Sequence, residues 1–121
     1  MIRLLQWNIW NNEDIDNIIK ELKRIKSDIV CIQELVIKDD NDIKIRKLKE
    51  LYSYIYYEKA DTFLDGYSQC NAILSKYPLY DKKYTYVQEA TDNKNDYSKE
   101  GRIYVEAKVK KIGRASCRER V

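Results

Sequence analysis

The chain has 121 residues, of which 44% are hydrophobic and 36% are charged, and its formal net charge is +3. This length allows one domain at most, and the balance of apolar and charged residues is that of a soluble globular protein. The longest apolar run is far shorter than the roughly 18 residues of a membrane span. Because the N-terminus also lacks the layout of a signal peptide, we expect a cytoplasmic protein.

The last ten residues, 112–121, differ in composition from the rest of the chain. They contain three Arg and no Lys, whereas residues 1–111 contain sixteen Lys and four Arg. The segment resembles the peptide encoded by a sequencing-library adaptor read behind a truncated gene, so we expect it to be non-native. The alternative is a natural basic tail. The segment contributes +2 of the net charge, and the remaining +1 does not indicate a basic face for nucleic acid.

The first part of the chain predicts a strand, a helix and a second strand. Residues 2–10 alternate in the manner of a strand, and apolar residues recur at helical spacing over 15–25. The uninterrupted apolar run 29–32 predicts a strand buried on both faces, which stops at Gln33 and Glu34. A crossover through a helix makes two such strands parallel.

Two polar side chains stand at the predicted carboxyl ends of these strands, Asn8 and Glu34. Parallel neighbours end at the same edge of a sheet, which is where open α/β sheets bind their ligands. We therefore expect an amide and a carboxylate to lie close together there as a candidate site. The alternatives are that Glu34 is a solvated strand end or a helix-capping acid, and that Asn8 caps the turn into the first helix.

The remainder of the chain predicts one more helix and then consecutive strands. A second amphipathic helix carries Ile45, Leu48 and Leu51, and strands are expected at 52–60, 68–76, 82–90 and 102–110, with loops at 61–66 and 92–99. This order predicts an α/β (α+β) fold with parallel pairing first and antiparallel pairing later. Cys31 and Cys70 begin or lie in apolar runs without a C-x-x-C partner. Since the chain has no His, a zinc site is not expected.

Three segments, 4–10, 28–35 and 71–79, together with a weaker fourth at 100–102, give the chain a family resemblance. In order and spacing they resemble the start of the endonuclease/exonuclease/phosphatase superfamily, which has the DNase-I-like fold. The resemblance implies a four-layer α/β sandwich, in which two mixed sheets pack face to face with helices outside. It also implies that residues 1–111 are the N-terminal half of such a domain.

The resemblance further implies a metal-dependent phosphohydrolase. Members of the family cut phosphodiester or phosphomonoester bonds with Mg²⁺ or Mn²⁺. Glu34 matches the principal metal ligand, and Asn8 matches an amide on the metal and phosphate side. Arg102 matches a commonly basic position, where it could contact substrate phosphate or form a surface ion pair with Glu100. Trp10 stands where some branches carry a second metal-side Asp, which favours a single metal.

The catalytic His pair, an Asp and another Asn of the family come from the second half of the domain, and this chain has no His. We therefore expect a fragment that binds metal but does not turn over substrate, and that exposes apolar sheet surface. The phosphate-ester substrate stays open among DNA, RNA, lipid phosphodiesters and inositol or sugar phosphates. Two other functions stay open: a non-catalytic nucleotide- or partner-binding α/β module, although no G-x-G-x-x-G motif is present, and an interaction protein without a catalytic half.

Overall fold

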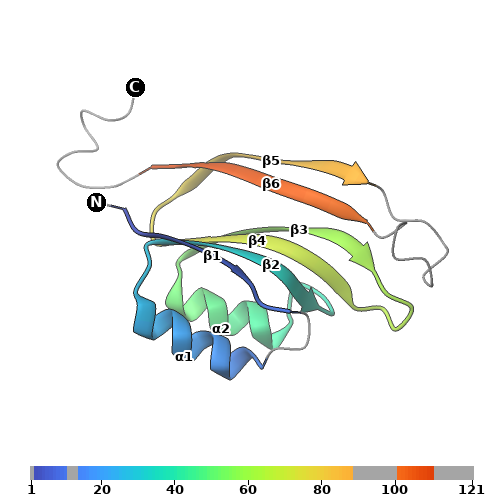
Figure 1. Ribbon diagram of the computed structural model, residues 1–121, viewed down its shortest axis with the longest axis horizontal. Coiled ribbons are helices and arrows are strands. Elements are labelled where there is room, and N and C mark those ends of the chain that lie inside the picture. The colour runs from blue at the N-terminus through green and yellow to red at the C-terminus, as the bar shows by residue number, and fades with distance from the viewer. Residues whose placement is uncertain (1, 11–13, 89–100, 111–121) are drawn as a thin grey trace.

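The computed structural model describes residues 2–10, 14–88 and 101–110. Within them, two helices and six strands form three layers (Figure 1). A four-stranded sheet in the order β1-β2-β4-β3 has the helices on one face and the two-stranded sheet β5-β6 over the other. The elements in chain order are β1 Leu4–Asn8, α1 Ile15–Ile25, β2 Ile29–Ile37, α2 Ile43–Leu51, β3 Tyr54–Thr62, β4 Ser68–Ser75, β5 Leu79–Gln88 and β6 Arg102–Val109.

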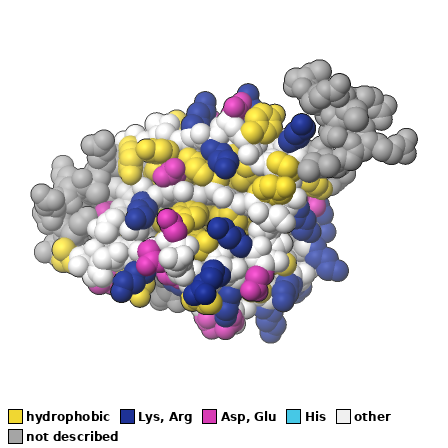
Figure 2. All heavy atoms as spheres, turned by 180° about the vertical axis from the view of Figure 1, so that it is seen from behind, with side chains coloured by type: hydrophobic (Ala, Val, Ile, Leu, Met, Phe, Trp, Pro, Cys, Tyr) yellow, Lys and Arg dark blue, Asp and Glu magenta, His cyan; other side chains and the backbone are white. Residues whose placement is uncertain are grey.

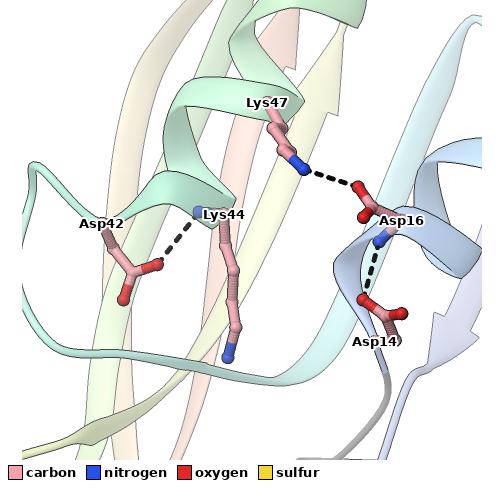
Figure 3. A network of polar contacts seen from close by, with 5 residues as sticks. All are labelled: Asp14, Asp16, Asp42, Lys44 and Lys47. Carbon is pink, nitrogen blue, oxygen red and sulfur yellow. Dashed lines mark hydrogen bonds and ion pairs between the residues drawn. The ribbon is translucent and has the colours of Figure 1, made fainter.

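Each helix begins at an aspartate whose side chain caps it. Asp14 accepts a hydrogen bond from the backbone N–H of Asp16 at 3.1 Å, and Asp42 accepts one from that of Lys44 at 2.9 Å. These caps satisfy donors that the first turn of a helix leaves without a partner. Figure 3 shows both caps and the ion pair between the helices, in which Lys47 Nζ lies 2.5 Å from Asp16 Oδ1. The pair is exposed, so it contributes little to the stability of the fold.

The hydrophobic core lies between the helices and the four-stranded sheet. Ile18 and Leu22 of α1 are each 1% exposed, and Leu48 of α2 is fully buried. The hydroxyl of Tyr52, at the end of α2, donates a 2.8 Å hydrogen bond to the carbonyl oxygen of Ser27. The sheet contributes the buried residues Val30, Ile32, Leu35, Ile37, Cys70, Ala72 and Leu74. Burial of this apolar face holds the helices on the sheet.

The second sheet covers the β3 side of the first. β6 lies against β3 and β4, and β5 lies against β3. The view from behind in Figure 2 shows apolar side chains gathered across the upper and middle parts of the molecule, with acidic and basic side chains among and below them. Tyr84 and Tyr86 of β5 are part of the exposed apolar surface, and their rings meet edge to face at 5.9 Å. On β1, Leu4 is 66% exposed, whereas its neighbour Leu5 packs against the core.

The predicted order of elements is confirmed, and several boundaries are wrong. The strand expected at 52–60 starts two residues later, because the N–H of Tyr52 still bonds to Leu48 O at 2.9 Å and so ends α2. The strand expected at 82–90 begins at Leu79, directly after Pro78. The loop 92–99 and the tail 112–121 lie outside the described residues. No helix in the described ranges is long and apolar enough to cross a membrane.

Candidate functional site

The predicted site begins with the pairing of β1 and β2. The two strands are parallel neighbours, as expected, and the last residue of β1, Asn8, lies opposite Gln33. Beyond this pair, the N–H of Ile9 donates to Gln33 O at 3.1 Å and closes the ladder. Glu34 is the next residue of β2. The backbone therefore brings Asn8 and Glu34 to neighbouring positions where the pairing of β1 with β2 ends.

One part of the prediction for Glu34 is wrong, because β2 does not end there. The strand continues to Ile37 by pairing with β4, and Glu34 lies at an irregularity inside it. Ile32 faces Ala72 and Leu35 faces Cys70, so Gln33 and Glu34 together oppose the single residue between those partners. Two residues opposite one is the pattern of a β-bulge.

The bulge changes which residues of β2 reach the core. Val30 and Ile32 are buried before it, and Leu35 and Ile37 are buried after it. An unbroken strand would put Glu34 on the face of Val30 and Ile32, since side chains alternate with a period of two. The extra residue removes Glu34 from that series and leaves it half-buried.

Glu34 has a left-handed backbone conformation, with φ of 63°. A residue with a Cβ atom loses roughly 1–2 kcal/mol in this region. Strain of this kind persists where the surrounding structure enforces it, and it is frequent at functional sites. The conformation is thus a second reason, independent of the strand order, to treat Glu34 as a site residue.

The amide of Asn8 has a partner in the structure. Its Oδ1 accepts a hydrogen bond at 3.0 Å from the backbone N–H of Trp10, whose φ is 53°. This contact agrees with the interpretation of Asn8 as a turn cap. A carbonyl oxygen has two lone pairs, so the same atom retains one with which to approach a cation. The exposed position of Asn8 allows that approach.

Arg102 belongs to the second sheet, whereas Asn8 and Glu34 belong to the first. Arg102 opens β6 in the second sheet, is exposed, and lies opposite Gln88. The neighbouring residue Ile103 is 7% exposed and faces the first sheet, so alternation along the strand places Arg102 on the other face. Its alternative partner, Glu100, lies outside the described residues. Contact between Arg102 and substrate phosphate therefore stays a prediction.

Two polar residues that the sequence did not single out connect the sheets near the bulge. Asn71, opposite Gln33 and Glu34, donates from Nδ2 to Ile103 O at 2.7 Å. Asp61 is 6% exposed, and its Oδ2 accepts the N–H of Gly101 at 3.1 Å. Asn71 was visible as a polar residue at the start of an apolar run, whereas Asp61 was assigned to a loop. Both hold the start of β6 against the first sheet.

The electrostatics of the described residues argue against thiol chemistry. Burial raises the pKa of the Cys70 thiol to about 12, and burial also raises the pKa of Cys31. Both thiols are therefore protonated near neutral pH, and a protonated thiol is a poor nucleophile. The described ranges contain no group of three or more His, Cys, Asp or Glu residues placed to hold a metal ion. A metal here would rest on few protein ligands.

The comparison with protein families identifies the chain. The model of the Endonuclease/Exonuclease/phosphatase family matches residues 5–108. The chain belongs to the endonuclease/exonuclease/phosphatase family. The match includes Asn8, Glu34 and Arg102, and it confirms the resemblance read from the sequence. The comparison with curated proteins found no match to this chain.

Solved structures of the same family confirm the fold. An endonuclease/exonuclease/phosphatase family protein from Leptotrichia buccalis C-1013-b matches with a TM-score of 0.65 and 14% identity over 92% of this chain. An endonuclease/exonuclease/phosphatase from Beutenbergia cavernae DSM 12333 matches with a TM-score of 0.68 and 17% identity over 93% of this chain. The chain spans 50% and 35% of the lengths of those two proteins. At these identities the matches show the DNase-I-like fold alone.

Proposed function

We propose that this chain carries the metal-binding half of a Mg²⁺- or Mn²⁺-dependent phosphohydrolase, a nuclease-like phosphodiesterase. Family membership supports the reaction class, the hydrolysis of phosphate esters. The observation that carries the assignment within the chain is the bulge that holds Glu34, with φ of 63°, next to the position of Asn8. Without the bulge, the regular alternation of side chains along β2 would direct this carboxylate toward the helices.

The available donor atoms suit a hard divalent cation. Glu34 offers carboxylate oxygens and Asn8 offers an amide oxygen, which are the ligand types that Mg²⁺ prefers. Magnesium keeps several waters and usually takes only one or two protein carboxylates, so one Glu with one amide is a sufficient protein contribution. The bound cation would supply charge neutralisation at the phosphoryl oxygens.

Each residue then has a limited task. The Glu34 carboxylate anchors the cation, and its half-buried position strengthens the attraction relative to bulk water. The amide of Asn8 orients one side of the bound phosphate or cation, and its contact with the N–H of Trp10 holds the oxygen in place. Neither side chain is suited to deprotonate the attacking water while it holds a cation, so this task falls to another residue. The family resemblance assigns it to His and Asp side chains, and the chain contains no His.

The metal site is tested with Mn²⁺ and nuclear magnetic resonance. We expect low concentrations of Mn²⁺ to broaden the backbone amide signals around Asn8 and Glu34 selectively, and Glu34→Gln to abolish the effect. Glu106→Gln is the matched control, because Glu106 is a strand glutamate in the other sheet that pairs with Lys83 at 3.9 Å. This variant should behave like the parent chain.

Three outcomes would contradict the proposal. Broadening centred on the acidic segment 39–42, or broadening unchanged by Glu34→Gln, would remove the metal site. Absence of any selective effect would favour a non-catalytic binding module. For catalysis, we expect the chain to leave bis(4-nitrophenyl) phosphate intact with Mg²⁺. Turnover that is abolished by Glu34→Gln would show that the chain already contains its general base.

A further inference from the structure

Strand β5 has an exposed apolar surface and an open edge. All side chains from Tyr80 to Val87 are exposed, and the large apolar ones among them are Tyr80 at 45%, Tyr84 at 50%, Tyr86 at 43% and Val87 at 69%. β5 pairs with β6, and within the described ranges no strand pairs with its other edge (Figure 1). An open strand edge with apolar side chains is a template for pairing with another strand.

The first sheet does not obstruct this edge. β5 lies against β3, and β3 is the last strand in the order β1-β2-β4-β3. Both sheets therefore end on the same side of the molecule. A strand from another molecule can pair with β5 there without displacing any described strand.

The charged groups of β5 already have partners on β6. Lys83 Nζ lies 3.9 Å from a carboxylate oxygen of Glu106, and Asp81 Oδ2 lies 3.2 Å from Lys108 Nζ. Residues 84–87 contain no charged side chain and no Pro, although charges and Pro are what usually protect an edge strand from pairing. The exposed part of the edge therefore suits an uncharged strand rich in aromatic residues, and β5 is itself such a strand.

Two copies of β5 are complementary in one register. When a strand pairs with its own copy about a two-fold axis, one residue lies opposite itself and its neighbours lie opposite each other. With Thr85 on the axis, Tyr84 of each copy lies opposite Tyr86 of the other, on the same face of the sheet. This gives two aromatic cross-strand pairs, which are stabilising. With Lys82 or Lys83 on the axis, two ammonium groups would lie opposite each other, which is destabilising.

We propose that a second copy of this chain binds along β5, so that the second sheets of two molecules join into one continuous antiparallel sheet. Thr85 lies on the two-fold axis of this dimer, and the paired rings of Tyr84 and Tyr86 lie on either side of it. The contact is separate from Asn8 and Glu34, which belong to the first sheet. It therefore does not rest on the proposed function.

Size-exclusion chromatography with light scattering, over a wide range of protein concentrations, tests the dimer. We expect the mass to rise from that of one chain to that of two. Tyr84→Ala removes both aromatic pairs, because each copy carries the substitution, and should raise the dissociation constant about tenfold. Tyr84→Phe should leave it unchanged. The matched control is Tyr104→Ala, since Tyr104 is 47% exposed in the same sheet but lies on β6, away from the joined edge.

A second variant tests the register without removing an aromatic ring. Thr85→Lys places two ammonium groups opposite each other on the axis, so it should also raise the dissociation constant several-fold. Thr85 is exposed, so this variant should keep the circular dichroism spectrum of the parent chain.

Three results would overturn the proposal. The first is the mass of a single chain at every concentration. The second is a dimer whose dissociation constant is unchanged by both Tyr84→Ala and Thr85→Lys, or is raised equally by Tyr104→Ala. The third is a dimer that Leu4→Lys abolishes and that Thr85→Lys leaves intact, because Leu4 is an exposed apolar residue of the first sheet.

Discussion

Replacement of Glu34 by glycine should stabilise the fold and abolish the proposed metal site. The φ of 63° at this position costs a residue with a Cβ atom roughly 1–2 kcal/mol. Glycine adopts this conformation freely, but its larger freedom in the unfolded chain returns about 0.5–1 kcal/mol of that gain. The net expectation is a free energy of unfolding higher by about 0.5–1 kcal/mol, from the difference of these terms.

Urea denaturation followed by circular dichroism measures this change, and Mn²⁺ broadening measures the site. Glu34→Ala separates the two contributions of the side chain, because alanine removes the carboxylate and keeps the strain. We expect Glu34→Ala to show no gain in stability and the same loss of Mn²⁺ binding. If the Glu34 side chain stabilised the fold instead of binding a ligand, Glu34→Gly would have a lower free energy of unfolding than the parent chain. That result would refute the reasoning.

Lys26→Gly is the matched control for strain. Lys26 caps the end of α1 with φ of 58°, close to the value at Glu34, and lies at the opposite end of the helix from Asp14. Glycine is favoured at such positions, so this variant should gain about as much stability, again roughly 0.5–1 kcal/mol. Its Mn²⁺ binding should be unchanged, since no strain at the proposed site is altered.

Two further predictions concern the core. Tyr52→Phe removes the hydroxyl that donates to Ser27 O at 2.8 Å and leaves a buried carbonyl without that donor. Urea denaturation should therefore show a free energy of unfolding lower by about 1–3 kcal/mol. An unchanged free energy of unfolding would show that the bond contributes nothing. Burial raises the pKa of the Cys70 thiol to about 12, so iodoacetamide at pH 8 should label Cys70 only after unfolding, as read by mass spectrometry. The thiol of the unfolded chain ionises near pH 8.5, whereas the buried thiol of the folded chain stays neutral up to about pH 12. The contribution of Cys70 to the free energy of unfolding is therefore fully present below pH 8.5 and is lost as the pH rises toward 12. Rapid labelling of folded Cys70 would contradict its burial.

The helices and the first two strands could be predicted from the sequence, because the patterns that indicate them involve residues close together in the chain. The helical spacing of apolar residues over 15–25 was found in the structure as α1, and Asp14, which directly precedes them, caps it. The run 29–32 was recognised as a strand, but burial on both faces was not found: Val30 and Ile32 are buried, whereas Ile29 and Cys31 on the other face are half-buried. The parallel pairing of β1 and β2 followed from the helix that joins them, since a crossover of this length allows no tight antiparallel turn.

The bulge at Glu34 could not be predicted from neighbouring residues in this way. Gln33 and Glu34 interrupt the apolar run, so sequence alone indicated the end of a strand. Whether a strand ends or continues after such an interruption depends on its partner. Here β4 supplies Cys70 and Gln69 opposite Leu35 and Val36 and carries the pairing past the bulge.

The sequence by itself determined the helices, the first parallel pair and the residue types that suit a divalent cation, because capping, periodicity and ligand chemistry are properties of neighbouring residues. Only the tertiary structure decided where those residues point. It placed Glu34 outside the core-facing series of β2, gave Trp10 its exposed left-handed conformation, and put Arg102 on an outward position of the second sheet. The positions of Glu34 and Arg102 depend on pairing between strands that are distant in the chain, and such pairing has no signature within either strand alone.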